Sequence, residues 1–157
     1  MIHPYLMYCN IIWGGASLLA LNRLVCLQKR ALRIIMCSHF RAPSNPLFAK
    51  LGILKLQDIH KFQILMFVYK FKNNLVPRCC MHLLHVRTSS SRYNLRHEHD
   101  FIHIAYRTLL RKKSIAVAGP ELWNVIPDLI KCSISVSIYK IRLVDFLKSS
   151  YFSTSEN

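Results

Sequence analysis

Apolar residues recur at the spacing of an α-helix in the first 40 residues of this chain. Five of them fall on one face at about 3.6 residues per turn: Leu21, Leu24, Val25, Leu32 and Ile35. Ser17 precedes this run and is a suitable N-cap, because its hydroxyl can accept a backbone N–H of the first turn. Only four glycines occur in 157 residues. Scarce glycine and long helical periodicity favour helices over a turn-rich β architecture.

Further helices are predicted downstream. Asn45-Pro46 indicates an N-cap and a first helical residue, and Gly52 indicates the end of a short helix through Leu51. A longer helix is expected over residues 56–73, with an apolar stripe wide enough for burial on two sides. Its stripe is Ile59, Phe62, Met66 and Tyr69, widened by Phe67 and Phe71. A final helix is expected from Ser135, with Val136, Tyr139, Leu143 and Phe146 on its apolar side.

The middle of the chain has a weaker pattern. We expect one short helix over residues 79–86, a polar loop over residues 88–91 and a short strand over residues 114–118. Pro120 is expected to begin a brief helix through Trp123. The sequence therefore predicts a mainly α fold. A small helical bundle at 1–76 is followed by a loop-rich linker at 77–97, a mixed helical subdomain at 98–150 with at most a short strand pair, and a frayed tail at 151–157.

Charge restricts the partners of this chain. Its formal net charge at pH 7 is +15, from 22 basic and 7 acidic residues, and no acidic residue precedes Asp58. Such an imbalance attracts polyanions, which leaves nucleic acid, an acidic membrane surface or an acidic protein as candidates. A merely solubilising surface usually mixes both signs of charge. We expect no cofactor and no small-molecule substrate.

Two groups of basic residues are candidates for contact with phosphates. The first lies opposite the apolar face of the N-terminal helix and comprises Arg23, Lys29, Arg30 and Arg33. The second comprises Arg92, Arg96, Arg107, Arg111, Lys112 and Lys113. Tyr93 and Tyr106 are candidate stacking platforms for unpaired bases, and core packing is the alternative for both. A solvated basic face is the alternative for the arginine stripe.

The N-terminus raises the question of a membrane span. No Asp, Glu, Lys or Arg occurs in residues 1–22, but Pro4, Asn10 and the Gly14-Gly15 pair break the apolar stretch. We therefore favour a segment that packs on an upstream domain. A small basic membrane-associated protein remains the less favoured alternative.

The cysteines follow no secreted disulfide pattern. All six are interpreted as reduced intracellular thiols, mostly small core residues. Cys79, Cys80, His82 and His85 lie close together, with His97, His99 and His103 downstream. No Cys-x-x-Cys occurs, so we expect no zinc site and interpret these histidines as partly exposed or as additional phosphate contacts.

Six blocks, in order, resemble the region downstream of the polymerase palm in jockey-like non-LTR retrotransposon reverse transcriptases. They are Tyr-Cys-x-x-x-Trp-Gly at 8–14, Leu-Gln-Lys-Arg-Ala-Leu-Arg-Ile-Ile at 27–35, the Pro-Leu-Phe block at 46–56, the Asp-Ile-x-Lys-Phe-Gln helix at 58–71, Tyr-Asn-x-Arg at 93–96 and Gly-Pro-x-Leu-Trp-Asn-x-x-Pro at 119–127. The closing helix at 135–147 matches more loosely. Leu95 stands where the family usually has Thr, and Met1 falls inside a family pattern, as expected for a truncated or decayed copy or a fragmentary gene model.

The resemblance implies a thumb-like helical region that grips an RNA template or an RNA/DNA hybrid, and an upstream palm domain as partner. Polymerisation in that family needs paired carboxylates that hold two metal ions. This sequence has no adjacent acidic pair. Its acids are Asp58, Glu98, Asp100, Glu121, Asp128, Asp145 and Glu156. We expect no catalytic residue here, and a structural or protein-interaction module is the alternative function.

Overall fold

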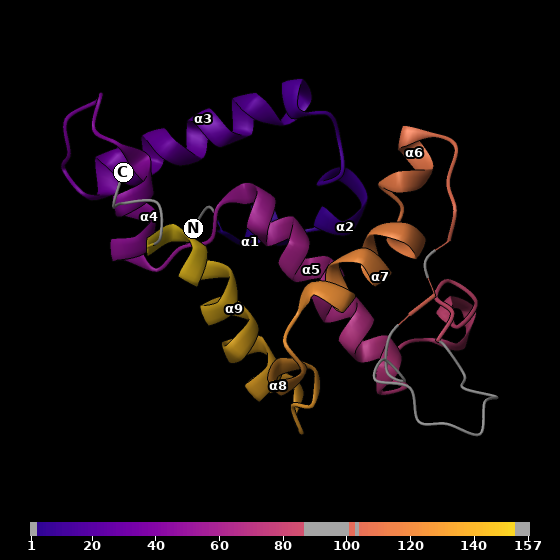
Figure 1. The fold of residues 1–157 in the computed structure, drawn as a ribbon. Helices are drawn as coiled ribbons and strands as arrows, with labels where there is room; N and C mark the ends of the chain where they lie inside the picture. Colours follow the sequence, from indigo (N-terminus) through magenta and orange to yellow (C-terminus); the bar gives the residue numbers. More distant parts are fainter. Residues whose placement is uncertain (1–2, 87–100, 103, 153–157) are drawn as a thin grey trace. The chain divides into compact units, whose positions relative to one another are not determined.

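The computed structural model describes residues 3–86, 101–102 and 104–152. Over this part of the chain the fold is all helical (Figure 1). The only β pairing among these residues is an isolated antiparallel bridge between Val86 and Phe101. The predicted mainly α class is confirmed. The helices are α1 (His3–Met7), α2 (Asn10–Trp13), α3 (Leu18–Ile35), α4 (Ser44–Leu51), α5 (Leu56–Lys72), the 3-10 turn η1 (Arg78–Cys80), α6 (Leu109–Lys112), α7 (Ile115–Val125), α8 (Asp128–Lys131) and α9 (Val136–Phe152).

Backbone contacts divide the chain into two compact units. The first unit combines Met1–Gln63 with Ser137–Asn157, and the second is Ile64–Val136. Helix α5 begins in the first unit and ends in the second. These two units do not coincide with the four predicted segments. Most of the predicted linker at 77–97 lies outside the described residues.

Local sequence signals set the ends of α3 and α4 in the first unit. The Ser17 hydroxyl accepts from the Ala20 N–H at 3.3 Å, which confirms the predicted N-cap. Helix α4 begins at Ser44, two residues before the expected start, with Pro43 at the cap position. Gly52 ends α4 in the left-handed region at φ 63°, as predicted. Glycine suits this position because it has no Cβ to clash there.

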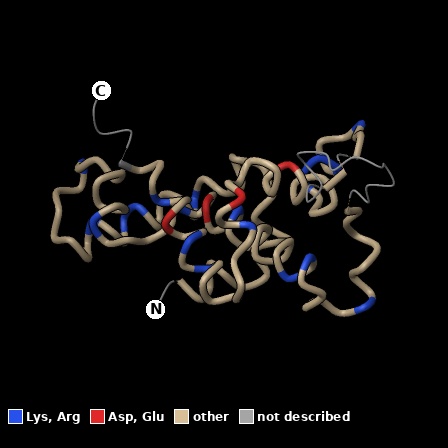
Figure 2. Tube along the Cα trace, turned by 60° about the horizontal axis from the view of Figure 1, so that its bottom comes forward, with Lys and Arg blue, Asp and Glu red and all other residues tan. Residues whose placement is uncertain are grey.

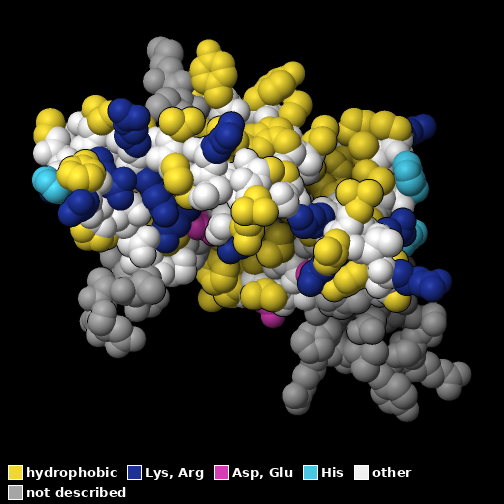
Figure 3. All heavy atoms as spheres, turned by 90° about the horizontal axis from the view of Figure 1, so that it is seen from above, with side chains coloured by type: hydrophobic (Ala, Val, Ile, Leu, Met, Phe, Trp, Pro, Cys, Tyr) yellow, Lys and Arg dark blue, Asp and Glu magenta, His cyan; other side chains and the backbone are white. Residues whose placement is uncertain are grey.

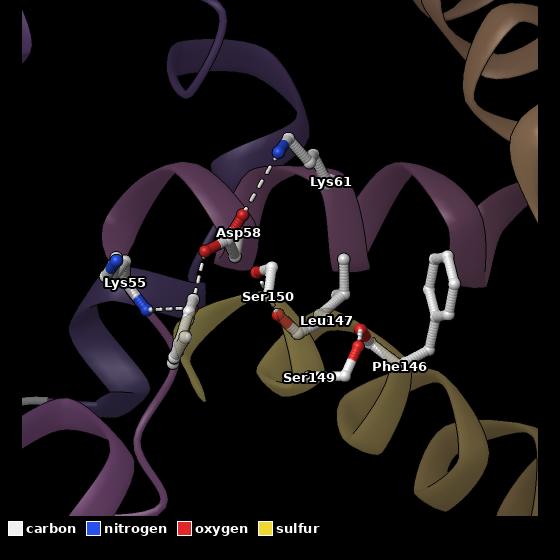
Figure 4. Close-up of polar contacts among 8 residues, drawn as sticks. Lys55, Asp58, Lys61, Phe146, Leu147, Ser149 and Ser150 are labelled. Atoms are coloured by element: carbon white, nitrogen blue, oxygen red, sulfur yellow. Dashed lines mark hydrogen bonds and ion pairs between the residues drawn. The ribbon is translucent and has the colours of Figure 1, made fainter. Parts of the chain in front are cut away.

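The core of the first unit is closed by Tyr151. Its ring lies edge-on to Phe48 at 6.5 Å, and both residues belong to a buried cluster with Leu32. Its hydroxyl donates to the Asp58 carboxylate and accepts from the Lys55 N–H at 3.0 Å (Figure 4). Burial raises the pKa of the Tyr151 phenol most, and the hydrogen bond to Asp58 raises it further. The hydroxyl therefore keeps its proton and donates. Residue 151 was expected to begin a frayed tail; instead it is 4 % exposed within α9.

A buried polar contact holds α2 in the first unit. The Nδ1 of His60 lies 3.1 Å from both the backbone oxygen and the side-chain oxygen of Asn10, so an Nδ1–H would donate to them. Desolvation by burial lowers the pKa of His60, and the bond to the Asn10 backbone opposes this effect. A Cβ on Gly14 would lie 2.4 Å from the same nitrogen, so only glycine fits beside the imidazole.

The second unit packs around Trp123. Its side chain is fully buried and meets Phe101 edge-on at 5.9 Å. The Tyr69 hydroxyl donates to the Ser133 carbonyl oxygen at 2.7 Å. Gly119 allows close approach, because a Cβ there would lie 3.0 Å from Val68. Helices α5 and α7 thus supply most of these core residues.

Three local predictions in the second unit were wrong: a strand at 114–118, a helix that begins at Pro120 and a helix over 79–86. Residues 114–118 form no strand, since α7 starts at Ile115 and contains Pro120 in its interior. A short apolar alternation is ambiguous between strand and helix, and burial of Val117, Pro120 and Trp123 at three-residue spacing favours the helix. The expected helix at 79–86 is only the three-residue η1, followed by turns. The loop predicted at 88–91 lies outside the described residues.

Candidate nucleic-acid interface

Helix α3 presents its basic side chains away from its buried face. Arg23 and Arg30 are exposed, whereas Leu21 and Leu32 on the opposite side are buried. Lys29 and Arg33 lie at the margin and are half-buried. Figure 2 shows basic positions along the described chain with few acidic ones between them. The structure therefore places Arg23 and Arg30 where a polyanion could reach them.

Arg33 has a structural role as well as a charge. Its Nε–H donates to the Ala42 carbonyl oxygen at 3.0 Å, which ties the loop after α3 back onto the helix. It also lies in the last turn, where a cation offsets the partial negative charge of the helix end. A guanidinium has five N–H donors, so this bond orients the group while the terminal nitrogens keep the capacity to donate to an anion.

The carboxylate nearest in sequence does not serve as a partner for the α3 face. Asp58 is 8 % exposed and is bonded to Tyr151 and, at 3.1 Å, to Lys61. No other acidic residue occurs before Glu98 in the sequence. Within the described residues neither Arg23 nor Arg30 forms an ion pair. Exposed cations without carboxylate partners keep their full attraction for phosphates, apart from screening by salt.

Large apolar side chains alternate with the arginines on α3. Leu19 is 88 % exposed, Leu27 is 60 % and Ile34 is 68 %. Figure 3 shows hydrophobic side chains beside Lys and Arg on this view of the molecule. A surface that served only solubility would carry few such residues. The interleaving of positive and apolar groups indicates a contact surface.

A second basic patch lies in the second unit around α6. Arg107, Arg111, Lys112 and Lys113 are all exposed there. Thr108 caps the helix, its hydroxyl accepting from the Arg111 N–H at 3.2 Å. This cap fixes the backbone from which the cations project. Arg111 and Lys112 lie in α6, Lys113 is its C-cap and Arg107 precedes its N-cap.

The two predicted stacking tyrosines have different outcomes. Tyr106 is 38 % exposed, so it is not a core residue, but the Lys112 Nζ lies 5.7 Å from its ring centroid. A cation over the ring competes with a base for that face. Tyr93 lies outside the described residues, as do Arg92 and Arg96.

The cysteines were predicted to be mostly core residues, and this prediction was wrong. Five of the six are exposed, and Cys80 is half-buried. The thiols of Cys79 and Cys80 lie 3.9 Å apart, and this contact, followed by burial, raises the pKa of Cys80. A raised pKa makes the reactive thiolate scarcer at neutral pH. Across the described residues no group of three or more Cys, His, Asp or Glu side chains could hold a metal ion; His97, His99 and His103 lie outside them.

Phe40 and Arg41 were missed as candidates by the sequence reasoning. Phe40 follows α3 and is 69 % exposed, and the Arg41 guanidinium carbon lies 5.1 Å from its ring centroid. Only a basic neighbour beside an isolated aromatic residue marks this pair in the sequence, and that signal is weak. The structure adds the exposure of the ring and its place beside the basic end of α3.

Comparison with protein-family models, curated proteins and solved structures finds no match. The resemblance to jockey-like elements thus rests on the sequence blocks alone. Within the described residues, no helix has both the length and the apolar character needed to cross a membrane.

Proposed function

We propose that this protein binds nucleic acid through the phosphate backbone, using the basic face of α3 and the α6 patch. The observation that carries the proposal is the exposed pair Arg23 and Arg30, on a helix face with no acidic neighbour in sequence before Asp58. Binding of this kind releases condensed counterions and is independent of base sequence. The resemblance adds a context for the proposal. Under the resemblance, the chain would be the non-catalytic C-terminal part of a reverse transcriptase and would hold an RNA template or RNA/DNA hybrid.

The test is a binding measurement on the purified chain. Fluorescence anisotropy with a labelled single-stranded RNA should give an affinity that falls steeply between about 50 and 200 mM salt. The double variant Arg23→Glu/Arg30→Glu should weaken binding at least tenfold, because each reversal removes one phosphate contact and adds one repulsion. Both side chains are exposed, so the thermal midpoint should change little.

A matched control separates a local interface from net charge. Lys70→Glu/Lys140→Glu changes the charge by the same amount at two exposed positions on α5 and α9. If the control weakens binding as much as the α3 variant does, attraction is diffuse and α3 is not the interface. If the wild type binds neither RNA nor DNA at about 50 mM salt, the proposal fails.

A protein-interaction module is the second candidate. The exposed Tyr5, Tyr8 and Ile12 favour it, with exposed fractions of 80 %, 77 % and 82 %. Large apolar side chains exposed this close together in the sequence are typical of an interface between proteins. Under the resemblance its partner would be an upstream palm domain. Retained RNA binding in a Tyr5→Ser/Tyr8→Ser/Ile12→Ser variant would assign this patch to a contact other than RNA.

A further inference from the structure

A hollow lies where α3 ends, beside the basic face. It has a volume of about 550 Å³, within the range of small-ligand sites, about 300–1,000 Å³. Two arginines, an aromatic ring and small polar or apolar groups line it: Arg30, Arg33, Ile34, Cys37, Ser38 and Phe40. All of these residues belong to the first unit. Cations and an exposed aromatic ring therefore share one concave surface.

The backbone that forms this hollow is held in place by the helix end. Cys37 adopts a left-handed conformation at φ 47°, its N–H donates to the Ile34 carbonyl oxygen at 3.1 Å, and Ser38 N–H donates to Arg33 at 2.9 Å. These two bonds form a Schellman motif, which usually has glycine at the left-handed position. The bond from Arg33 to Ala42 then closes the loop. Phe40 consequently projects from a fixed turn.

The chemistry of the hollow matches an unpaired nucleotide. An aromatic side chain offers a stacking surface to any base. Arg41 lies over the Phe40 ring at 5.1 Å and the His39 ring lies 4.8 Å away, so a base that stacks on Phe40 must displace one of these side chains from the 69 % exposed ring. Arg30 and Arg33 supply the positive charge that a phosphate needs. In the interior of a duplex both faces of each base are stacked on neighbours, so Phe40 can stack there only on a base that has left the helix.

We propose that this hollow binds one unpaired nucleotide of a single strand, with its base on Phe40 and its phosphate at Arg30 and Arg33. The inference rests on the proposed function and makes it more specific, since it predicts a preference for single strands over duplexes. Cys37 and Ser38 are the only other polar groups of the lining, so base discrimination is weak. Arg30 serves both the α3 face and the hollow, whereas Phe40 serves the hollow alone.

Phe40→Ala in the full chain is the deciding variant. Affinity for a labelled oligouridylate of about 12 nucleotides should fall about 5- to 150-fold, the range of base–aromatic stacking. Affinity for a blunt duplex of the same length should stay within about twofold, because the backbone contacts remain. Phe40→Trp should retain single-strand binding. Tyr8→Ala removes an equally exposed aromatic residue of the first unit and should have no effect.

Photo-crosslinking gives a second readout that does not depend on a variant. A 4-thiouridine oligonucleotide bound to the wild-type chain should crosslink to a peptide containing residues 37–41. Crosslinks confined to other peptides would overturn the proposal even if Phe40→Ala failed to fold.

The outcomes distinguish the two proposals. Absence of all nucleic-acid binding would remove both. Equal affinity for single strand and duplex, unchanged by Phe40→Ala, would remove the nucleotide site and leave the proposed function standing. Loss of binding to anionic phospholipid vesicles in Phe40→Ala, with oligouridylate binding intact, would assign the hollow to lipid and overturn the nucleotide proposal.

Discussion

The side-chain amide of Gln28 donates a hydrogen bond to the carbonyl oxygen of Leu54 at 2.9 Å. Its oxygen in turn accepts from the Leu56 N–H at 3.1 Å, at the first residue of α5. Gln28 is 7 % exposed, so this one side chain satisfies a buried donor and a buried acceptor of the backbone. It joins α3 to the start of α5.

Gln28→Glu should destabilise the first unit. A carboxylate can accept from Leu56 but cannot donate to Leu54, which leaves a buried carbonyl unsatisfied beside a negative charge. The free energy of unfolding should fall by at least about 1–3 kcal/mol, measured by urea denaturation. Gln57→Glu is the matched control: it makes the same change at an exposed position in the first turn of α5 and should stay within about 0.5 kcal/mol. Equal losses of unfolding free energy in the two variants would mean that the added charge, and not the lost hydrogen bond, causes the destabilisation.

Tyr151→Phe should also lower the free energy of unfolding by about 1–3 kcal/mol. The substitution keeps the ring in the core but removes the donor to the buried Asp58 carboxylate and the acceptor for Lys55 N–H. Tyr8→Phe removes a hydroxyl from a residue that is 77 % exposed and should leave the denaturation midpoint unchanged. A midpoint for Tyr151→Phe that equals the wild type would show that Lys61 alone satisfies Asp58.

Stability should fall as the pH drops from about 7 to 5. The pKa of His60 is lowered in the folded chain, chiefly by burial. Below the ordinary imidazole pKa of 6.5, the unfolded chain therefore binds more protons than the folded one, and unfolding becomes easier. His60→Gln should show a flatter thermal midpoint over this pH range. An equally steep slope would assign the effect to the other histidines.

Neutralising the α6 patch should reduce the salt dependence of RNA binding. Each lost phosphate contact lowers the slope of log affinity against log salt by about 0.7 for a single strand. Arg111→Gln/Lys112→Gln/Lys113→Gln should therefore lower it by about 2 if all three residues contact phosphates. The change should add to that of the α3 double variant, because the two patches share no residue. An unaltered slope would remove the α6 patch from the interface.

Local signals in the sequence predicted those parts of the fold that depend on neighbouring residues. The Ser17 cap and the glycine at 52 were identified correctly, because each acts within one helical turn. The outward position of Arg23 and Arg30 also followed from helical spacing alone. The all-helical class follows from the same periodicity.

Contacts between distant residues decided the rest. Burial of Val117, Pro120 and Trp123, spaced by three residues, favours the helix over residues 115–125 against the local strand pattern. Tyr151 meets Asp58 across 93 residues, and Gln28 meets Leu54 across 26. Phe40 and Arg30 line one hollow because of the turn that follows α3, which the sequence did not reveal. Sequence spacing fixes which face a side chain takes on its own helix, but only tertiary packing fixes which distant groups share a core or a hollow.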